Sequence, residues 1–120
     1  MKRKIPMDEW SGFLESFSLQ HDGWLVDVSS GSPAAATLVR DAPLEGITTR
    51  SGPGQREVVV TVGGSRDEHR QLVAHEPVSI RLESEGGVDQ GLEIESKEGG
   101  SMRVTICSPI APELVDGIAP

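Results

Sequence analysis

The chain contains no tyrosine, and its other aromatic residues, two Trp and two Phe, all lie within the first 24 positions. No aromatic side chain after Trp24 is therefore available to stack on a nucleic-acid base. The formal net charge of −8 also repels a phosphate backbone, and the short basic stretch at Lys2–Lys4 does not change that balance. These features argue against a nucleic-acid partner.

Cysteine and long apolar runs are also scarce. The single cysteine, Cys107, cannot form an intramolecular disulfide and fits a reducing compartment. The apolar runs are short, as at Val58–Val60, whereas a membrane-spanning helix needs about 20 apolar residues. The basic start resembles the first part of a secretory signal, but Asp8 and Glu9 follow where an apolar segment would be required. We therefore expect a cytoplasmic protein with no membrane partner.

The aromatic residues that are present predict one amphipathic helix. Trp10, Phe13, Leu14 and Phe17 have the spacing of one helical stripe, which has to be buried for so short a helix to be stable. Gly23 supplies a stop signal after them. We expect a helix over 7–22 and disorder over 1–5.

The hydrophobic period changes to two after Gly23, as in Val78, Ile80 and Leu82. Such alternation is typical of antiparallel strands with one buried face, and glycine-rich turns separate the runs. The expected strands lie between 24 and 107, at 24–30, 36–41, 56–62, 70–75, 78–85, 92–96 and 102–107. We therefore expect a single α+β domain over 1–120, with the helix packed on a curved antiparallel meander of six or seven strands. In a variant of this fold the sheet closes partly into a barrel. The tail, 109–120, either packs on an edge strand or forms a docking peptide.

Sites for catalysis, metals or cofactors are not indicated. His69 and His75 lie about 20 Å apart if they share a strand, which is too far to hold one metal ion. Cys107 has no base or cationic group near it in the sequence. Gly86 and Gly91 have the spacing of a phosphate-binding loop but lack its Lys. We predict no catalytic residue, no metal site and no cofactor.

An acidic surface is the most specific cluster in the sequence. Glu83, Glu85, Glu93 and Glu95 share the solvent-facing side of two neighbouring strands if 78–85 pairs with 92–96. The structural interpretation is that Arg81 and Arg103, which are in phase with them, neutralise the carboxylates. The functional hypotheses are that this face binds a basic partner or that the 86–91 turn binds a Ca²⁺-like ion.

Several short segments near both ends of the chain resemble a family of small bacterial proteins classed as a domain of unknown function. The matching segments are Ile5-Pro6, Glu9-Trp10, Phe13-Leu14, Phe17, His21, Gly23-Trp24-Leu25-Val26, Pro43–Ile47, Leu92–Ser96, Ser108-Pro109 and Pro112–Gly117. The resemblance implies a single stand-alone domain. It implies no activity, cofactor or site residue.

These observations lead to three hypotheses about function. The first is a non-catalytic protein–protein interaction module, which could form a homodimer through an edge strand or through the second apolar face of 56–62. An alternative is a small-molecule binder or minor enzyme with a pocket between helix and sheet, near Trp10, His21 and Trp24. A further alternative is a structural subunit of a larger assembly.

Overall fold

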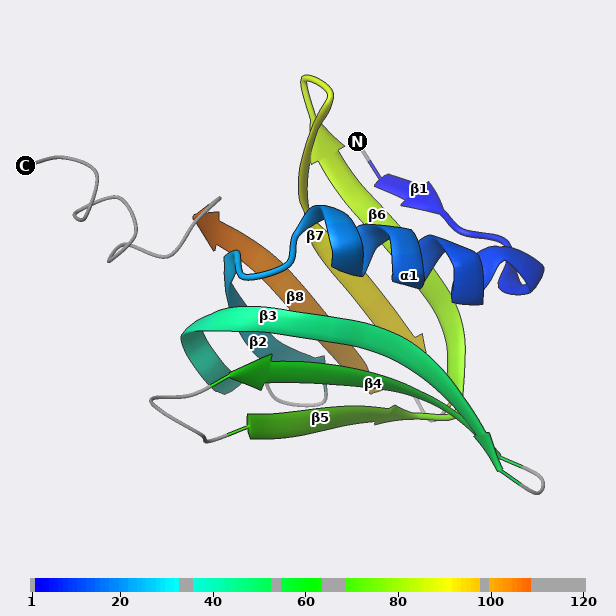
Figure 1. Cartoon of the computed structure of the whole chain (residues 1–120). Coiled ribbons are helices and arrows are strands. Elements are labelled where there is room, and N and C mark those ends of the chain that lie inside the picture. The colour runs from blue at the N-terminus through cyan, green and yellow to red at the C-terminus, as the bar shows by residue number, and fades with distance from the viewer. Residues whose placement is uncertain (1, 33–35, 53–54, 64–68, 98–99, 109–120) are drawn as a thin grey trace, which may run out of the picture.

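A computed structural model describes residues 2–32, 36–52, 55–63, 69–97 and 100–108, and it shows one N-terminal helix packed on an eight-stranded antiparallel sheet (Figure 1). In chain order the elements are β1 (Lys2–Lys4), the 3-10 helix η1 (Met7–Glu9), α1 (Trp10–Gln20), β2 (Leu25–Ser32), β3 (Ala36–Gly52), β4 (Gln55–Gly63), β5 (His69–His75), β6 (Pro77–Glu85), β7 (Val88–Ser96) and β8 (Ser101–Ser108). The α+β class is confirmed. The expected count of six or seven strands is wrong, and the sheet is not closed. The predicted tail, 109–120, lies outside the described residues.

The helix begins and ends close to where its local signals predict. Asp8 and Glu9 lie in the first turn of η1, where their charge complements the positive end of the helix dipole. α1 ends at Gln20, and Gly23 adopts a left-handed φ of 82° that a glycine takes without strain. The helical region therefore spans 7–20 in two segments.

The N-terminal segment corrects the expectation of disorder over 1–5 for its described residues. Lys2–Lys4 pair with Arg81–Glu83 of β6, and the backbone N–H of Ile5 donates to the carbonyl of Ile80 at 2.8 Å. The Ile5 side chain is buried, and its carbonyl accepts a 2.9 Å hydrogen bond from Trp10 Nε1. Tertiary contacts thus order a segment whose own sequence carries only charge.

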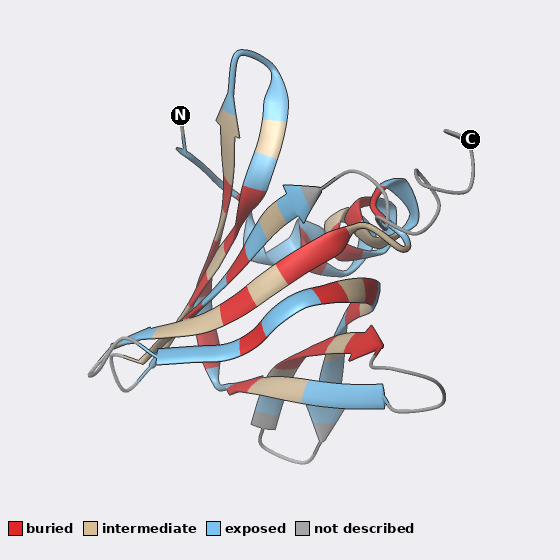
Figure 2. Ribbon diagram, turned by 90° about the vertical axis from the view of Figure 1, so that its left-hand side faces the viewer, coloured by how far each residue is buried: buried red, intermediate tan, exposed pale blue. Residues whose placement is uncertain are grey.

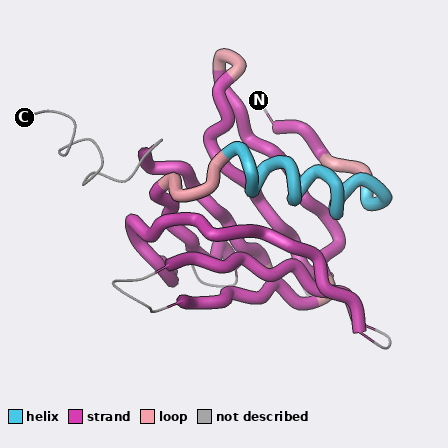
Figure 3. The backbone as a smooth tube through the Cα atoms, in the orientation of Figure 1, coloured by secondary structure: helices cyan, strands magenta, loops and turns pink. Residues whose placement is uncertain are grey.

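The sheet has the order β1-β6-β7-β8-β2-β3-β4-β5, with all neighbours antiparallel. It consists of two meanders, β2 to β5 and β6 to β8, which β2 and β8 join by pairing with each other. Strands make up most of the described backbone, and the connections between them are short (Figure 3). The predicted meander is therefore present in two parts and not as one run.

β3 changes partner along its length and so bends the first meander. Ala36–Pro43 pair with β2, whereas Leu44–Gly52 pair with β4, and the register shifts at Glu45. An extra residue of this kind bends a strand. β3 consequently curves away from β2 toward the viewer and passes under α1 in Figure 1.

The core lies between two layers. One layer is the part of the sheet formed by β1, β6, β7, β8 and β2, and the other is α1 with β3, β4 and β5 (Figures 1 and 2). Buried and exposed residues alternate along the strands, as the sequence predicts. Trp10, Leu14 and Phe17 form the buried side of α1, and Phe13 packs partly buried beside them. At Gly91 a side chain would collide with the carbonyl oxygen of Val104, so β7 and β8 approach as closely as they do because this residue is glycine.

Candidate binding groove

A groove of about 380 Å³ lies between the outer side of α1 and the second half of β3. We call it the helix–strand groove. Its helical wall presents Ser11, Glu15, Ser18 and Leu19, which the helical period brings to one side, and its other wall is Glu45–Thr49. Leu19 is 74 % exposed, which is high for an apolar side chain. The groove thus combines an uncovered apolar residue with hydroxyl and carboxylate groups.

Ser18 connects the two walls. Its Oγ accepts a 2.8 Å hydrogen bond from the backbone N–H of Ile47. The hydroxyl proton has two carbonyl acceptors within reach, that of Leu14 at 2.7 Å and that of Ile47 at 3.2 Å. The Ser18 side chain therefore satisfies the backbone of Ile47 where a neighbouring strand otherwise would.

Beyond Ile47 this edge of β3 has no strand partner among the residues that the structure describes. Because strand hydrogen bonds alternate in direction, the backbone N–H and C=O of Thr49 face the same edge as those of Ile47, about 7 Å farther along. β2 has already ended, since its first residue, Leu25, pairs with Pro43. Among the described residues no group bonds to Thr49 on this edge. The open donor and acceptor lie in the wall of the groove.

The charge of the groove is negative. Glu15 has no cation within ion-pair distance among the residues that the structure describes. Glu45, on the opposite wall, lies 2.8 Å from Nδ1 of His69. A ligand that enters the groove therefore meets one unpaired carboxylate and one shared with an imidazole.

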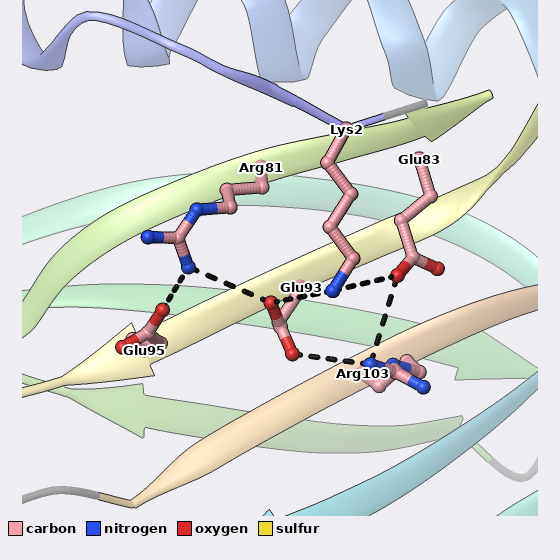
Figure 4. A network of polar contacts seen from close by, with 6 residues as sticks. All are labelled: Lys2, Arg81, Glu83, Glu93, Glu95 and Arg103. Atoms are coloured by element: carbon pink, nitrogen blue, oxygen red, sulfur yellow. Dashed lines mark hydrogen bonds and ion pairs between the residues drawn. The ribbon is translucent and has the colours of Figure 1, made fainter.

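The predicted acidic surface is an alternating network of charges on the face of the sheet opposite α1 (Figure 4). Arg81 pairs with Glu93 and Glu95, and Arg103 pairs with Glu83 and Glu93. Lys2 joins it at 3.4 Å from Glu83 and 3.5 Å from Glu93. The two predicted arginines thus neutralise the carboxylates, and Lys2 is a partner that the sequence did not indicate.

Glu93 lies at the centre of this network and is the best-paired carboxylate in it. Partial burial works to raise the pKa of Glu93, but the hydrogen bond from Arg103 and the charge of Lys2 outweigh it, so that its pKa lies below the usual value. Glu85 lies outside the network, at the exposed end of β6. Three of the four carboxylates on this face already have cations beside them, so a basic partner would have to compete with these ion pairs.

The predicted pocket residues divide between the two ends of α1. Trp10 and His21 are about 16 Å apart along the helix axis. His21 is buried between Phe17 and Trp24, with ring centroids 4.2 and 4.6 Å away. Its Nδ1 lies 2.8 Å from the carbonyl oxygen of Phe17, which can only accept, so Nδ1 carries the proton. The structure brings His21 and Trp24 together and separates both from Trp10.

Cys107 lies beside two carboxylates, which makes it a poor nucleophile. Although its side chain is exposed, partial desolvation of the sulfur and the nearby Asp27 and Asp41 raise the pKa of the thiol to about 11. One ligand atom from each of the three residues lies within 4.8 Å of the others. The backbone N–H of Asp41, at a φ of 51°, donates to Asp27 at 2.8 Å, so the irregular pairing of β2 with β3 itself holds these two carboxylates side by side.

The two strand histidines lie on the outer face of β5, opposite Leu72 and Ala74. His75 lies 2.9 Å from Glu57. The hydrogen bond from Arg50 is the main cause that lowers the pKa of Glu57, and the charge of His75 adds to it. Each histidine is thus engaged with its own carboxylate.

Comparison with known proteins finds no family model that matches the chain, no similar curated protein and no matching solved structure. The resemblance to a bacterial family therefore stays an expectation. No helix among the described residues has the length and apolar character needed to cross a membrane.

The groove was not predicted, because its two walls are far apart in the chain and no sequence pattern links them. Glu45–Thr49 falls where Pro43 and Gly46 interrupt the two-residue period. Ser18 and Glu15 read as ordinary polar positions of an amphipathic helix. An apolar Leu19 on the polar side of that helix was the one available signal.

Proposed function

We propose that this protein is a non-catalytic, cytoplasmic interaction module that binds an extended, basic segment of a partner protein in the helix–strand groove. The open edge of β3 at Thr49 carries the proposal, because an unpaired strand edge accepts a further strand through main-chain hydrogen bonds. Ser18 occupies the edge at Ile47, so the added segment would begin at Thr49 and run toward Ser51.

The side chains around that edge favour a particular kind of segment. An extended chain lies about 4.8 Å from its neighbour, and its side chains point alternately to two sides. The side that faces α1 would meet both Leu19 and Glu15, which lie one helical turn apart, so it suits an apolar residue and a cation two positions from each other. The net charge of −8 would further attract a basic segment over long range.

A labelled peptide of repeating Lys-Thr-Val-Thr, which places Lys and Val on one side, tests this proposal against one of repeating Glu-Thr-Val-Thr, by fluorescence polarisation. We expect saturable binding of the Lys peptide alone. Glu15→Gln should weaken it several-fold, since one exposed ion pair contributes up to about 1 kcal/mol. Thr49→Pro should abolish it, because proline removes the edge donor.

Glu9→Gln is the matched control, since it removes the same charge from an exposed position outside the groove. It should leave binding nearly unchanged. Equal losses for Glu9→Gln and Glu15→Gln would show a general charge effect and contradict the proposed site, as would the absence of saturable binding.

A further inference from the structure

The two ends of the sheet are protected very differently. A free strand edge tends to pair with another chain unless it is short, charged or covered. β1, at one end, has three residues, and all of them, Lys2, Arg3 and Lys4, are exposed cations. Two copies of such an edge repel each other, so this end is protected by its charge.

β5, at the other end, is longer and carries a single permanent cation, Arg70. It is seven residues long, contains neither proline nor lysine, and pairs with β4 without a register shift from His69 to His75. β5 is the terminal strand in the order of the sheet, and its outer edge carries no other described strand in either view (Figures 1 and 2). Leu72 and Val73, one on each face, are only partly buried at its centre.

We propose that β5 pairs antiparallel with β5 of a second copy of this chain, around a two-fold axis at Leu72. This register uses all seven residues. It sets Leu72 against its own copy, Gln71 against Val73, and Arg70 against Ala74, so no two arginines face each other. His69 meets His75, and each lies beside a carboxylate of its own chain, Glu45 or Glu57.

The edge of β5 is a better interface than the second face of β4, which the sequence also suggested. Val59 is the apolar residue at the middle of that face, and it is only 3 % exposed. Its cross-strand neighbours, Thr48 and Val73, already flank it. A partner on that face would find little apolar surface left to bury, whereas no described strand pairs with the outer edge of β5.

The experiment measures the mass of the full chain by sedimentation equilibrium over a range of concentrations. We expect a reversible monomer–dimer equilibrium whose dissociation constant falls as salt is added, because each copy carries a charge of −8. A chain that stays monomeric up to millimolar concentration would overturn the proposal.

Charge variants at Gln71, which is exposed, identify the interface. In the proposed register the two copies of this residue are diagonal neighbours on one face, about 7–8 Å apart. Gln71→Lys and Gln71→Glu should each weaken the dimer roughly two- to fivefold, and an equimolar mixture of the two should restore it. Gln90→Lys, at an exposed position of β7 far from β5 in the order of the sheet, is the control and should dimerise like the parent chain.

If both Gln71 variants still dimerise like the parent chain, the contact lies on another surface and the proposed pairing of β5 is contradicted. Binding of the basic peptide is measured separately, in the Gln71→Lys variant. Since Thr49 and β5 lie at different edges, loss of the dimer should leave peptide binding in place, so that the two proposals fail independently.

Discussion

Ser18 joins the helix to the sheet through one hydroxyl group, and its removal tests that role directly. In Ser18→Ala the backbone N–H of the fully buried Ile47 loses its 2.8 Å acceptor. An unpaired buried donor costs about 1–3 kcal/mol. Alanine returns roughly 0.5 kcal/mol through its higher helix propensity. We expect a net loss of about 1–2 kcal/mol in the free energy of unfolding.

Urea unfolding followed by tryptophan fluorescence measures this change, because Trp10 and Trp24 flank the helix that Ser18 anchors. For a domain of 120 residues each 1 kcal/mol should also lower Tm by roughly 3–5 °C. Ser11→Ala is the matched control, since Ser11 lies on the same side of α1 and is exposed. It should be neutral or slightly stabilising.

If Ser18→Ala unfolds at the same urea concentration as Ser11→Ala, Ser18 does not anchor the helix to β3. Ser18→Thr adds a second check, since threonine keeps a hydroxyl group at the same position. If the hydrogen bond to Ile47 is the cause, Ser18→Thr should recover most of the stability that Ser18→Ala loses.

Three further results are expected. Gly12→Ala should raise the free energy of unfolding by about 0.5–1 kcal/mol in a urea titration, because a Cβ there meets open space on an exposed helical turn, and no gain would contradict the helix-propensity argument. Cys107 should react with iodoacetamide roughly tenfold more slowly at pH 8 than an unperturbed thiol. A pKa of about 11 leaves little thiolate, and the higher nucleophilicity of that thiolate offsets this only in part. Asp27→Asn should speed the reaction because it removes one of the charges that raise the pKa. Glu93→Gln should cost about 1 kcal/mol at pH 7. Because the folded-state pKa of Glu93 lies below its usual value of 4.5, this deficit should shrink as pH falls below 4.5, and a deficit that is independent of pH in thermal melts would refute the assignment.

The local hydrophobic period was sufficient to predict most of the helical and strand segments. It failed where tertiary contacts determine the backbone structure. The stripe at Trp10, Leu14 and Phe17 predicts α1 because each residue lies one helical turn from the next. β1 could not be predicted, since three consecutive cations have neither apolar period nor strand propensity. Its pairing with β6 depends on Ile5, which is buried and bonded to Trp10.

β3 was predicted to stop at 41 and in fact extends to Gly52. Pro43 and the extra residue at Glu45 interrupt the alternation, which resumes with Ile47 in a new phase. The open edge at Thr49 follows from that change of partner. Sequence patterns report which residues are buried, but they do not report which strand edges lose their neighbours.

The pairing of β2 with β8 constrains the order in which the chain can fold during synthesis. β2 ends at Ser32, and β8, its partner, begins only at Ser101. At about 5–20 residues per second, the ribosome adds that stretch in roughly 3–14 s. The aromatic stripe of α1 is made first, and throughout this interval it lacks much of the sheet that covers it. The apolar side chains of Trp10, Leu14 and Phe17 thus reach their final burial only after β6, β7 and β8 have been made.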